Sequence, residues 1–190
     1  MISLKQKYYF IVESIKDIDL TKIKKRKKFI IIYRNKSNSE SKADLLLFRK
    51  RCKIKSIDFY VANNLALAIA LNSDGVYLSS YNKTFEALSL KKLNFKIIGS
   101  AHSHKEITMK IKQGCTNILF SKLFLVNYDK KSKFVGILKF NNLLKNNKNL
   151  IPLGGINQNN LNSLKTVDSK GLALMSEVKK KPVNIINRLF

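Results

Sequence analysis

The chain has 190 residues, of which 45% are hydrophobic, and a formal net charge of +25. This length predicts a single domain over residues 1–190 with one packed core. The charge raises the question of a nucleic-acid or anionic membrane partner. Lysines are scattered along the whole chain and arginine is rare, which favours a generally solvated basic surface; polyanion binding stays as the alternative.

Compartment and redox state follow from simple patterns. Cys52 and Cys115 lie far apart in apolar surroundings, which predicts buried, reduced thiols. The first ten residues lack a signal-peptide pattern. No apolar run approaches the roughly 18 residues of a membrane span. We therefore expect a cytoplasmic protein with no membrane partner.

Short β-rich runs alternate with helical stretches along the chain. The predicted strands are residues 8–12, 29–33, 58–61, 74–78, 96–100, 117–121, 150–154 and 171–176. The predicted helices are residues 19–25, 39–52, 64–71, 84–88, 104–113, 133–144, 158–167 and 182–189, and the asparagine-rich stretch 141–149 is expected to be a loop. Eight such units favour a compact (β/α)₈ TIM barrel with short helices, and a doubly wound open sheet is the alternative.

Functional groups of such a barrel gather where its strands end. The predicted strand ends carry polar, cationic and glycine residues without carboxylates, a set that suits an anionic ligand. Gly154 and Gly155 let backbone N–H groups approach a phosphate, and Ser176 adds a donor from the next strand. Arg34 and Lys36 are placed to clamp a diphosphate.

His102 and Lys122 follow two further strands. His102 is predicted either to face the cavity or to bond a backbone carbonyl. Three extra lysines near strand ends could stabilise developing negative charge without a metal. These are Lys83, Lys122 and Lys130.

Five segments, in order, resemble the thiamine phosphate synthase/TenI family. They are Tyr33-Arg34-Asn35-Lys36, Asp74-Gly75-Val76-Tyr77-Leu78 (Asp-Gly-Val-His-Leu in the family), Ser100-Ala101-His102-Ser103 with Glu106, Leu153-Gly154-Gly155-Ile156, and Gly171-Leu172-Ala173-Leu174-Met175-Ser176. Each is weak alone, and together they cover nearly the whole chain.

The resemblance implies a function in thiamine biosynthesis. Thiamine phosphate synthase joins a pyrimidine diphosphate to a thiazole phosphate and releases pyrophosphate with Mg²⁺, whereas TenI tautomerises a thiazole carboxylate phosphate. Carried over, Arg34 and Lys36 match the diphosphate contacts and Ser100 the serine near the leaving pyrophosphate. Gly155 and Ser176 match the thiazole-phosphate site, with Gly154 and Met175 beside them in the same motifs.

The departures from the family pattern concern metal and catalysis. Asn63 and Asn82 occupy the positions of two metal-ligand aspartates, and Mg²⁺ rarely binds neutral amides alone, although a diphosphate could itself coordinate the ion. Asn63 thus stays only as a substrate-binding candidate. Ile32 replaces a glutamine, and residues 126–129 replace a Thr-x-Thr-Lys loop that Lys130 follows. Lys122 replaces the TenI catalytic histidine.

These departures leave four hypotheses. The favoured one is a divergent synthase-like transferase acting on phosphorylated thiazole and pyrimidine metabolites. The rivals are a TenI-like tautomerase, disfavoured by Lys122, and a non-catalytic thiazole-phosphate or thiamine-phosphate binding protein. Nucleic-acid binding through the global charge is the fourth.

Overall fold

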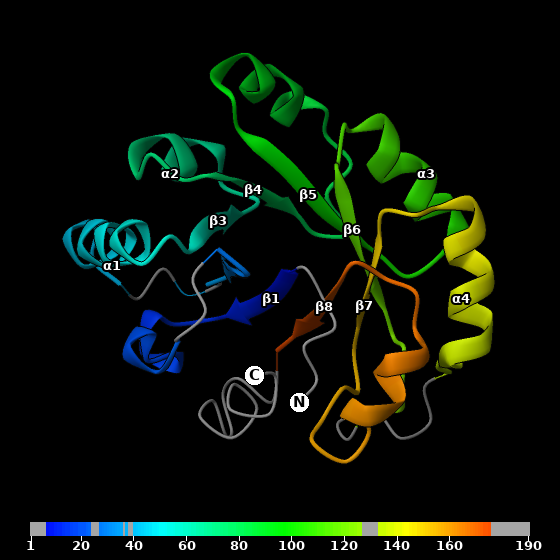
Figure 1. The fold of residues 1–190 in the computed structure, drawn as a ribbon. Coiled ribbons are helices and arrows are strands. Elements are labelled where there is room, and N and C mark those ends of the chain that lie inside the picture. The colour runs from blue at the N-terminus through cyan, green and yellow to red at the C-terminus, as the bar shows by residue number, and fades with distance from the viewer. Residues whose placement is uncertain (1–6, 24–26, 36, 38–39, 127–132, 176–190) are drawn as a thin grey trace.

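The computed structural model describes residues 7–23, 27–35, 37, 40–126 and 133–175 (Figure 1). Eight parallel strands form one sheet in the order β7-β6-β5-β4-β3-β2-β1-β8. The strands are β1 (Lys7–Val12), β2 (Phe29–Tyr33), β3 (Asp58–Ala62), β4 (Gly75–Leu78), β5 (Lys96–Ala101), β6 (Asn117–Ser121), β7 (Leu150–Leu153) and β8 (Gly171–Leu174). The two edge strands β7 and β8 also contact each other, so the sheet is a nearly closed barrel. The predicted (β/α)₈ fold is confirmed.

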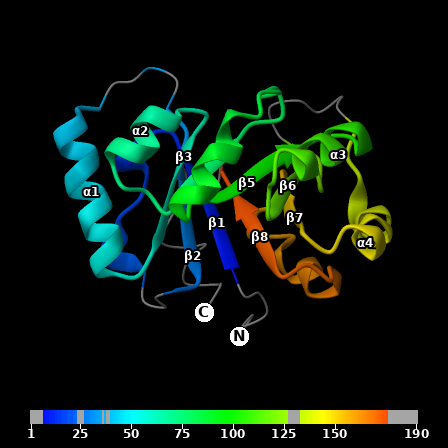
Figure 2. The ribbon, with the colours of Figure 1, turned by 90° about the horizontal axis from the view of Figure 1, so that it is seen from above.

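Short helices surround the strands, with α1 and α2 on one side and α3 and α4 on the other (Figure 2). The α-helices are α1 (Lys42–Ile54), α2 (Leu65–Ala70), α3 (His104–Lys112) and α4 (Gly136–Asn146). Side chains of Ser41, Asn64 and Ser103 accept a backbone N–H and so begin α1, α2 and α3. Within the described part of the chain, no helix is both long enough and apolar enough to cross a membrane.

Three of the predicted helices are 3₁₀ helices instead. These are η2 (Leu20–Lys22), η3 (Glu86–Leu93) and η4 (Leu161–Thr166), and a further short 3₁₀ turn, η1 (Ile15–Asp17), follows β1. Before η4, the side chains of Asn157 and Asn160 accept backbone N–H groups, which competes with a regular α-helical start. The helix predicted at residues 182–189 lies outside the described residues.

The loop predicted at residues 141–149 is wrong over its first six residues, because α4 continues to Asn146. Phe140 and Leu144 of this helix are buried against the barrel. Tertiary packing of this apolar face outweighs the low helix propensity of asparagine. Asn141 also donates to the carbonyl of Thr166, so one asparagine tethers the helix to η4.

The strands bury both of their faces, which places two apolar layers around one sheet. Alternate residues point into the barrel and pack against each other. This inner cluster consists of Tyr9, Ile11, Ile30, Ile32, Tyr60, Tyr77, Ile98, Leu119, Ile151 and Ala173. The intervening residues pack outward against the helices in a larger cluster. The inner cluster fills the barrel, so a ligand is restricted to its mouth.

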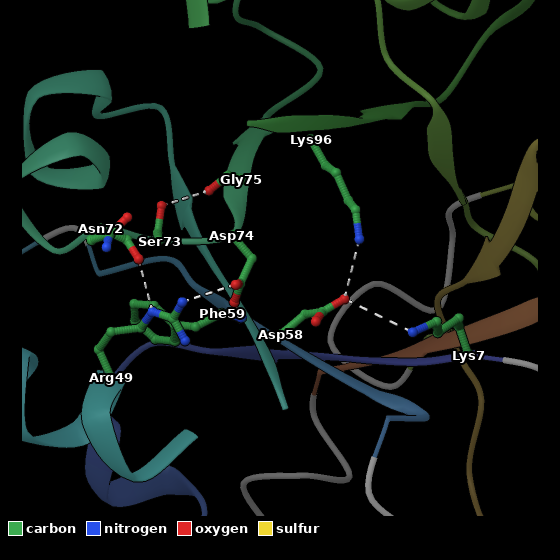
Figure 3. A network of polar contacts seen from close by, with 9 residues as sticks. All are labelled: Lys7, Arg49, Asp58, Phe59, Asn72, Ser73, Asp74, Gly75 and Lys96. Carbon is green, nitrogen blue, oxygen red and sulfur yellow. Dashed lines mark hydrogen bonds and ion pairs between the residues drawn. The ribbon is translucent and has the colours of Figure 1, made fainter. Parts of the chain in front are cut away.

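Charged side chains close the barrel at the amino ends of its strands (Figure 3). Arg49 of α1 lies 2.8 Å from Asp74, which also accepts the N–H of Phe59 at 2.7 Å. Nearby, Lys7 and Lys96 each lie 3.8 Å from Asp58. The aspartate before β4 is therefore a structural anchor rather than a ligand group.

Candidate functional site

A cavity of about 810 Å³ opens at the carboxyl ends of the strands. Every strand except β3 contributes to it, either by its last residues or by the loop that follows. Six residues expected at the site line this cavity: Arg34, Ser100, His102, Gly154, Gly155 and Met175. Groups far apart in sequence thus converge on one mouth, as the barrel interpretation requires.

The other predicted site residues divide into two sets. Asn63 and Lys122 belong to the described part of the chain and are not among the residues that line the cavity. Lys36, Lys130 and Ser176 lie outside the described residues. Of the predicted site residues that the structure describes, it therefore brings together the arginine, serine, histidine, glycines and methionine, and leaves out Asn63 and Lys122.

Gly154 and Gly155 form a tight turn after β7 with positive φ angles of 93° and 69°. A Cβ at Gly155 would lie 2.5 Å from the carbonyl oxygens of Phe124 and Leu125, so no other residue fits without strain. Asn160 donates to the carbonyl of Gly155 at 2.7 Å. No described residue accepts the backbone N–H of Gly155. This rigid turn at the cavity wall suits an oxyanion.

Arg34 extends into the cavity from the end of β2. Its backbone N–H donates to Val12, and its guanidinium Nη2 lies 3.4 Å from the sulfur of Met175 and 4.0 Å from a carboxylate oxygen of Glu13. A sulfur and a carboxylate at this distance are weak partners for a guanidinium. Arg34 therefore keeps donor capacity for an anionic ligand.

Glu13 lines the same cavity, so the prediction of a mouth without carboxylates is wrong. This residue follows β1 directly, and its backbone N–H donates to Asp17 at 2.9 Å. The strand-end reasoning that identified Arg34 and Ser100 would have found Glu13 had it been applied to the first strand as well. A carboxylate beside the arginine lowers the net positive charge that a diphosphate would meet.

Tyr77 and Ser100 form the cavity floor, and the tyrosine was not predicted as a site residue. Tyr77 is 1% exposed, Ser100 is also buried, and both line the cavity. The nearby side chains of Ser100 and Arg34 lower the pKa of Tyr77, but the effect of burial outweighs theirs. Burial raises the pKa of Tyr77, so its hydroxyl stays protonated.

His102 both lines the cavity and bonds the backbone, so its two predicted roles coexist. Its Nδ1 lies 3.2 Å from the carbonyl oxygen of Ser121, and its own backbone N–H donates to Glu106 at 2.6 Å. A proton on Nδ1 directed at that carbonyl leaves Nε2 as an acceptor. The histidine ring is thereby held in one orientation at the cavity wall.

The two asparagines that the resemblance places at metal-ligand positions make hydrogen bonds within the protein. The amide oxygen of Asn63 accepts the N–H of Ser79 at 2.9 Å, and its amide nitrogen donates to Ser79 Oγ and Tyr81. The amide oxygen of Asn82 accepts the N–H of Thr84 at 3.1 Å. Among the described residues, no three His, Cys, Asp or Glu side chains gather as a metal site. These residues do not fit a protein-bound Mg²⁺.

Two buried residues at the carboxyl end of α3, Lys110 and the C-cap residue Gln113, bind the loop that follows β4. Lys110 and Gln113 are fully buried. The ammonium of Lys110 donates to the carbonyl of Asn82 at 2.7 Å, and Gln113 donates to that of Thr84 at 2.6 Å. Burial lowers the pKa of Lys110. The expectation that the lysines are solvated is thus wrong for this one, which anchors the loop carrying Ser79 and Tyr81 to the cavity.

Comparison with known proteins gives the same fold and a family. A family profile described as thiamine monophosphate synthase matches residues 9–178. The solved thiamine phosphate pyrophosphorylase from Pyrococcus furiosus superposes with a TM-score of 0.73 at 19% identity, over 100% of both chains. The 3-keto-L-gulonate-6-phosphate decarboxylase from Vibrio cholerae superposes with a TM-score of 0.61 at 11% identity, over 98% of this chain and 100% of that one. At such identities, the two structures establish the barrel fold alone.

Two curated relatives carry the same name. The thiamine-phosphate synthase of Persephonella marina is 28% identical over 154 residues, which are 78% of this chain and 73% of that protein. A thiamine-phosphate synthase of Prochlorococcus marinus is 30% identical over 129 residues, 67% of this chain but only 37% of that protein. This match therefore spans well under half of that relative. The family profile covers most of this chain, residues 9–178, so the chain belongs to the thiamine monophosphate synthase family.

Proposed function

We propose that this chain is a transferase that joins a pyrimidine diphosphate to a thiazole phosphate and releases pyrophosphate. The observation that carries this proposal is the convergence of Arg34, Ser100 and the Gly154–Gly155 turn on one cavity in a member of this family. A single cavity with separate donor groups on its floor and wall suits two phosphorylated substrates. The partners are therefore small phosphorylated metabolites.

In this proposal two groups of donors in the cavity each bind one substrate. Arg34 and Ser100 hold the diphosphate, and the N–H groups of the Gly154–Gly155 turn hold the thiazole phosphate. As pyrophosphate departs, negative charge grows on its leaving oxygen. The guanidinium of Arg34 and the hydroxyl of Ser100 are donors that can stabilise this charge.

The cavity residues supply this stabilisation without a protein-held metal. Neither Asn63 nor Asn82 lines the cavity, and Glu13 is one carboxylate beside an arginine rather than a metal cluster. The proposed stabilisation therefore depends on donors of the cavity residues themselves. His102 and Met175 complete the cavity wall and are assigned to shaping the substrate pocket.

A second candidate is a non-catalytic protein that binds thiazole phosphate or thiamine phosphate. It is favoured by one specific observation, the engagement of both asparagines in internal hydrogen bonds where the family carries metal ligands. Such a protein would use the same glycine turn and arginine. The TenI-like alternative gains no such support, because Lys122 is not among the residues that line the cavity.

The deciding experiment incubates the purified full chain with both precursors, with and without Mg²⁺. Thiamine phosphate is detected by chromatography and pyrophosphate by a coupled assay. We expect both products in equal amounts. Calorimetric binding of thiazole phosphate with no product in either condition would replace the transferase by the binding protein. Substitution of Gly155 would be a poor test, since a Cβ there strains the loop regardless of any ligand.

A further inference from the structure

Tyr81 is an exposed aromatic residue at the cavity to which the proposed function assigns no role. It is 71% exposed, yet it is one of the residues that line the cavity. Phe85, further along the same loop, is also exposed but does not line the cavity. Single exposed apolar side chains are common in proteins, so exposure by itself indicates no site. The contacts that hold Tyr81 beside the cavity distinguish it from Phe85.

Tyr81 lies in a tight turn that follows β4. The N–H of Asn82 donates to the carbonyl of Ser79 at 3.0 Å, which closes a four-residue turn with Tyr81 in its third position. The buried ammonium of Lys110 donates to the carbonyl of Asn82 at 2.7 Å and so ties the turn to α3. The backbone that carries Tyr81 is therefore fixed in place.

The side chain of Tyr81 is held as well, by Asn63 at the end of β3. The amide nitrogen of Asn63 donates to the Tyr81 hydroxyl at 3.0 Å and to Ser79 Oγ. The backbone N–H of Ser79 donates to the amide oxygen at 2.9 Å, which fixes the orientation of the amide because an N–H must face an acceptor. The hydroxyl end of Tyr81 is thus tied to the neighbouring strand end, while most of its surface stays accessible.

The strand order places Tyr81 closer to the diphosphate donors than to the glycine turn. In the sheet, β4 pairs with β5 on one side and is separated from β2 by β3 on the other. Arg34 follows β2 and Ser100 lies on β5, and both line the same cavity as Tyr81. The Gly154–Gly155 turn follows β7, beyond both β5 and β6. A ring attached to the diphosphate is therefore the substrate group nearest to Tyr81 in this arrangement.

We propose that Tyr81 is a specificity-determining residue whose ring contacts the pyrimidine ring of the diphosphate substrate, and that Asn63 positions it. This inference rests on the proposed function for the identity of the substrate. Aromatic side chains bind planar heteroaromatic rings through stacking and burial of apolar surface. Arg34 and Ser100 recognise only the diphosphate, so a contact with the ring distinguishes the substrate from free pyrophosphate.

Tyr81→Leu removes the aromatic ring from an exposed position and should leave the fold intact. The probes are the pyrimidine diphosphate and inorganic pyrophosphate, each titrated by calorimetry into the full chain. We expect the dissociation constant of the pyrimidine diphosphate to rise about tenfold, the effect of losing one stacking contact, and that of pyrophosphate to stay within about twofold. The matched control, Phe85→Leu, should change neither value. Unchanged affinity of Tyr81→Leu for the pyrimidine diphosphate would overturn the proposal, as would an equal loss for both probes.

A second pair of variants tests the positioning role of Asn63. Tyr81→Phe keeps the ring and removes the hydroxyl that Asn63 binds, whereas Asn63→Gly removes the amide where the φ of 55° suits glycine. Each should weaken binding of the pyrimidine diphosphate about threefold, because the ring is present but no longer held. Since both changes break the same bond, the double variant should match Asn63→Gly within about twofold. Losses that multiply in full, or wild-type affinity in Tyr81→Phe, would contradict this role.

The outcomes distinguish this inference from the proposed function. Wild-type protein that binds the pyrimidine diphosphate but forms no thiamine phosphate, together with a weakened Tyr81→Leu variant, removes the transferase and keeps the role of Tyr81. Wild-type protein that forms product, together with an unaffected Tyr81→Leu variant, removes the role of Tyr81 alone. Wild-type protein that does not bind the pyrimidine diphosphate overturns both.

Discussion

The two ends of the barrel use charged residues in different ways. At the amino ends of the strands, Asp74 accepts hydrogen bonds from Arg49 at 2.8 Å and from the N–H of Phe59 at 2.7 Å (Figure 3). At the carboxyl ends, the guanidinium Nη2 of Arg34 has a sulfur at 3.4 Å and a carboxylate oxygen of Glu13 at 4.0 Å. The charges of the first pair hold the fold together. The second pair keeps hydrogen-bonding capacity that a ligand can use.

The largest effect is expected from Arg34→Gln at the cavity. Removing a charged donor from the diphosphate site should lower kcat/KM about 100-fold, in line with the loss of one preorganised donor. Thermal stability should change little, because the arginine has only weak partners in the protein. Steady-state pyrophosphate release and a melting curve on the same sample measure both. A variant with a clearly lower melting temperature but an unchanged kcat/KM would contradict this prediction.

Asp74→Ala should show the opposite pattern. Arg49 would lose its short ion-pair partner and Phe59 its acceptor, which should lower the free energy of unfolding by about 2 kcal/mol for a partly exposed pair. Urea denaturation measures this loss, and kcat/KM should stay within about twofold of wild type.

Asp58→Asn is the matched control at the same end of the barrel. Its two lysine partners are 3.8 Å away and more exposed, so the cost should be below about 0.5 kcal/mol. An equal cost for the two aspartates would mean that the short Arg49–Asp74 contact adds nothing.

The sequence predicts the strands and part of the cavity, but it does not predict every cavity residue. The strands were predictable because buried β-branched runs such as residues 29–33 leave few alternatives. Arg34 and Ser100 were predictable as cavity residues because both lie at predicted strand ends. Tyr77 was not, since a tyrosine inside a buried strand has the same pattern whether or not its hydroxyl reaches a cavity.

The contacts that fix the asparagines could not be predicted either. The resemblance to the family predicts aspartates at the positions of Asn63 and Asn82, and only the fold shows that their amides bond Ser79 and Thr84. The same holds for the buried Lys110. Its ammonium donates to the carbonyl of Asn82, which lies 28 residues away in the sequence. Such partners are set by tertiary structure and leave no local pattern in the sequence.

Glu40 is a carboxylate near the carboxyl ends of the strands that is bound by hydrogen bonds within the protein. Burial alone would raise the pKa of Glu40, but hydrogen bonds lower it to about 2. The donors are Ser14, Tyr33, Ile15 and Asn35. The ionised form is thus favoured in the folded state.

This pKa sets a direction for acid stability. The stabilisation from Glu40 should be complete above the ordinary carboxyl pKa of 4.5 and should be lost as the pH falls toward 2. Glu40→Gln should therefore make the unfolding midpoint depend less steeply on pH in that range. Melting curves between pH 2 and pH 5, compared with Asp44→Asn on the exposed start of α1, measure the change. An unchanged slope would mean that Glu40 is not held by its four donors.

Glu13→Gln should produce the smallest effect and refine the comparison at the cavity itself. The carboxylate of Glu13 lies 4.0 Å from the guanidinium of Arg34 and lines the same cavity, so it repels the diphosphate that the arginine attracts. The neutral amide should tighten pyrophosphate binding about threefold at low ionic strength, and the gain should shrink at high salt because these groups are partly solvated. Calorimetric titration at two salt concentrations measures both. Weaker binding in Glu13→Gln would instead show that this carboxylate orients Arg34, and that the charges at the mouth are as tightly paired as those at the opposite end.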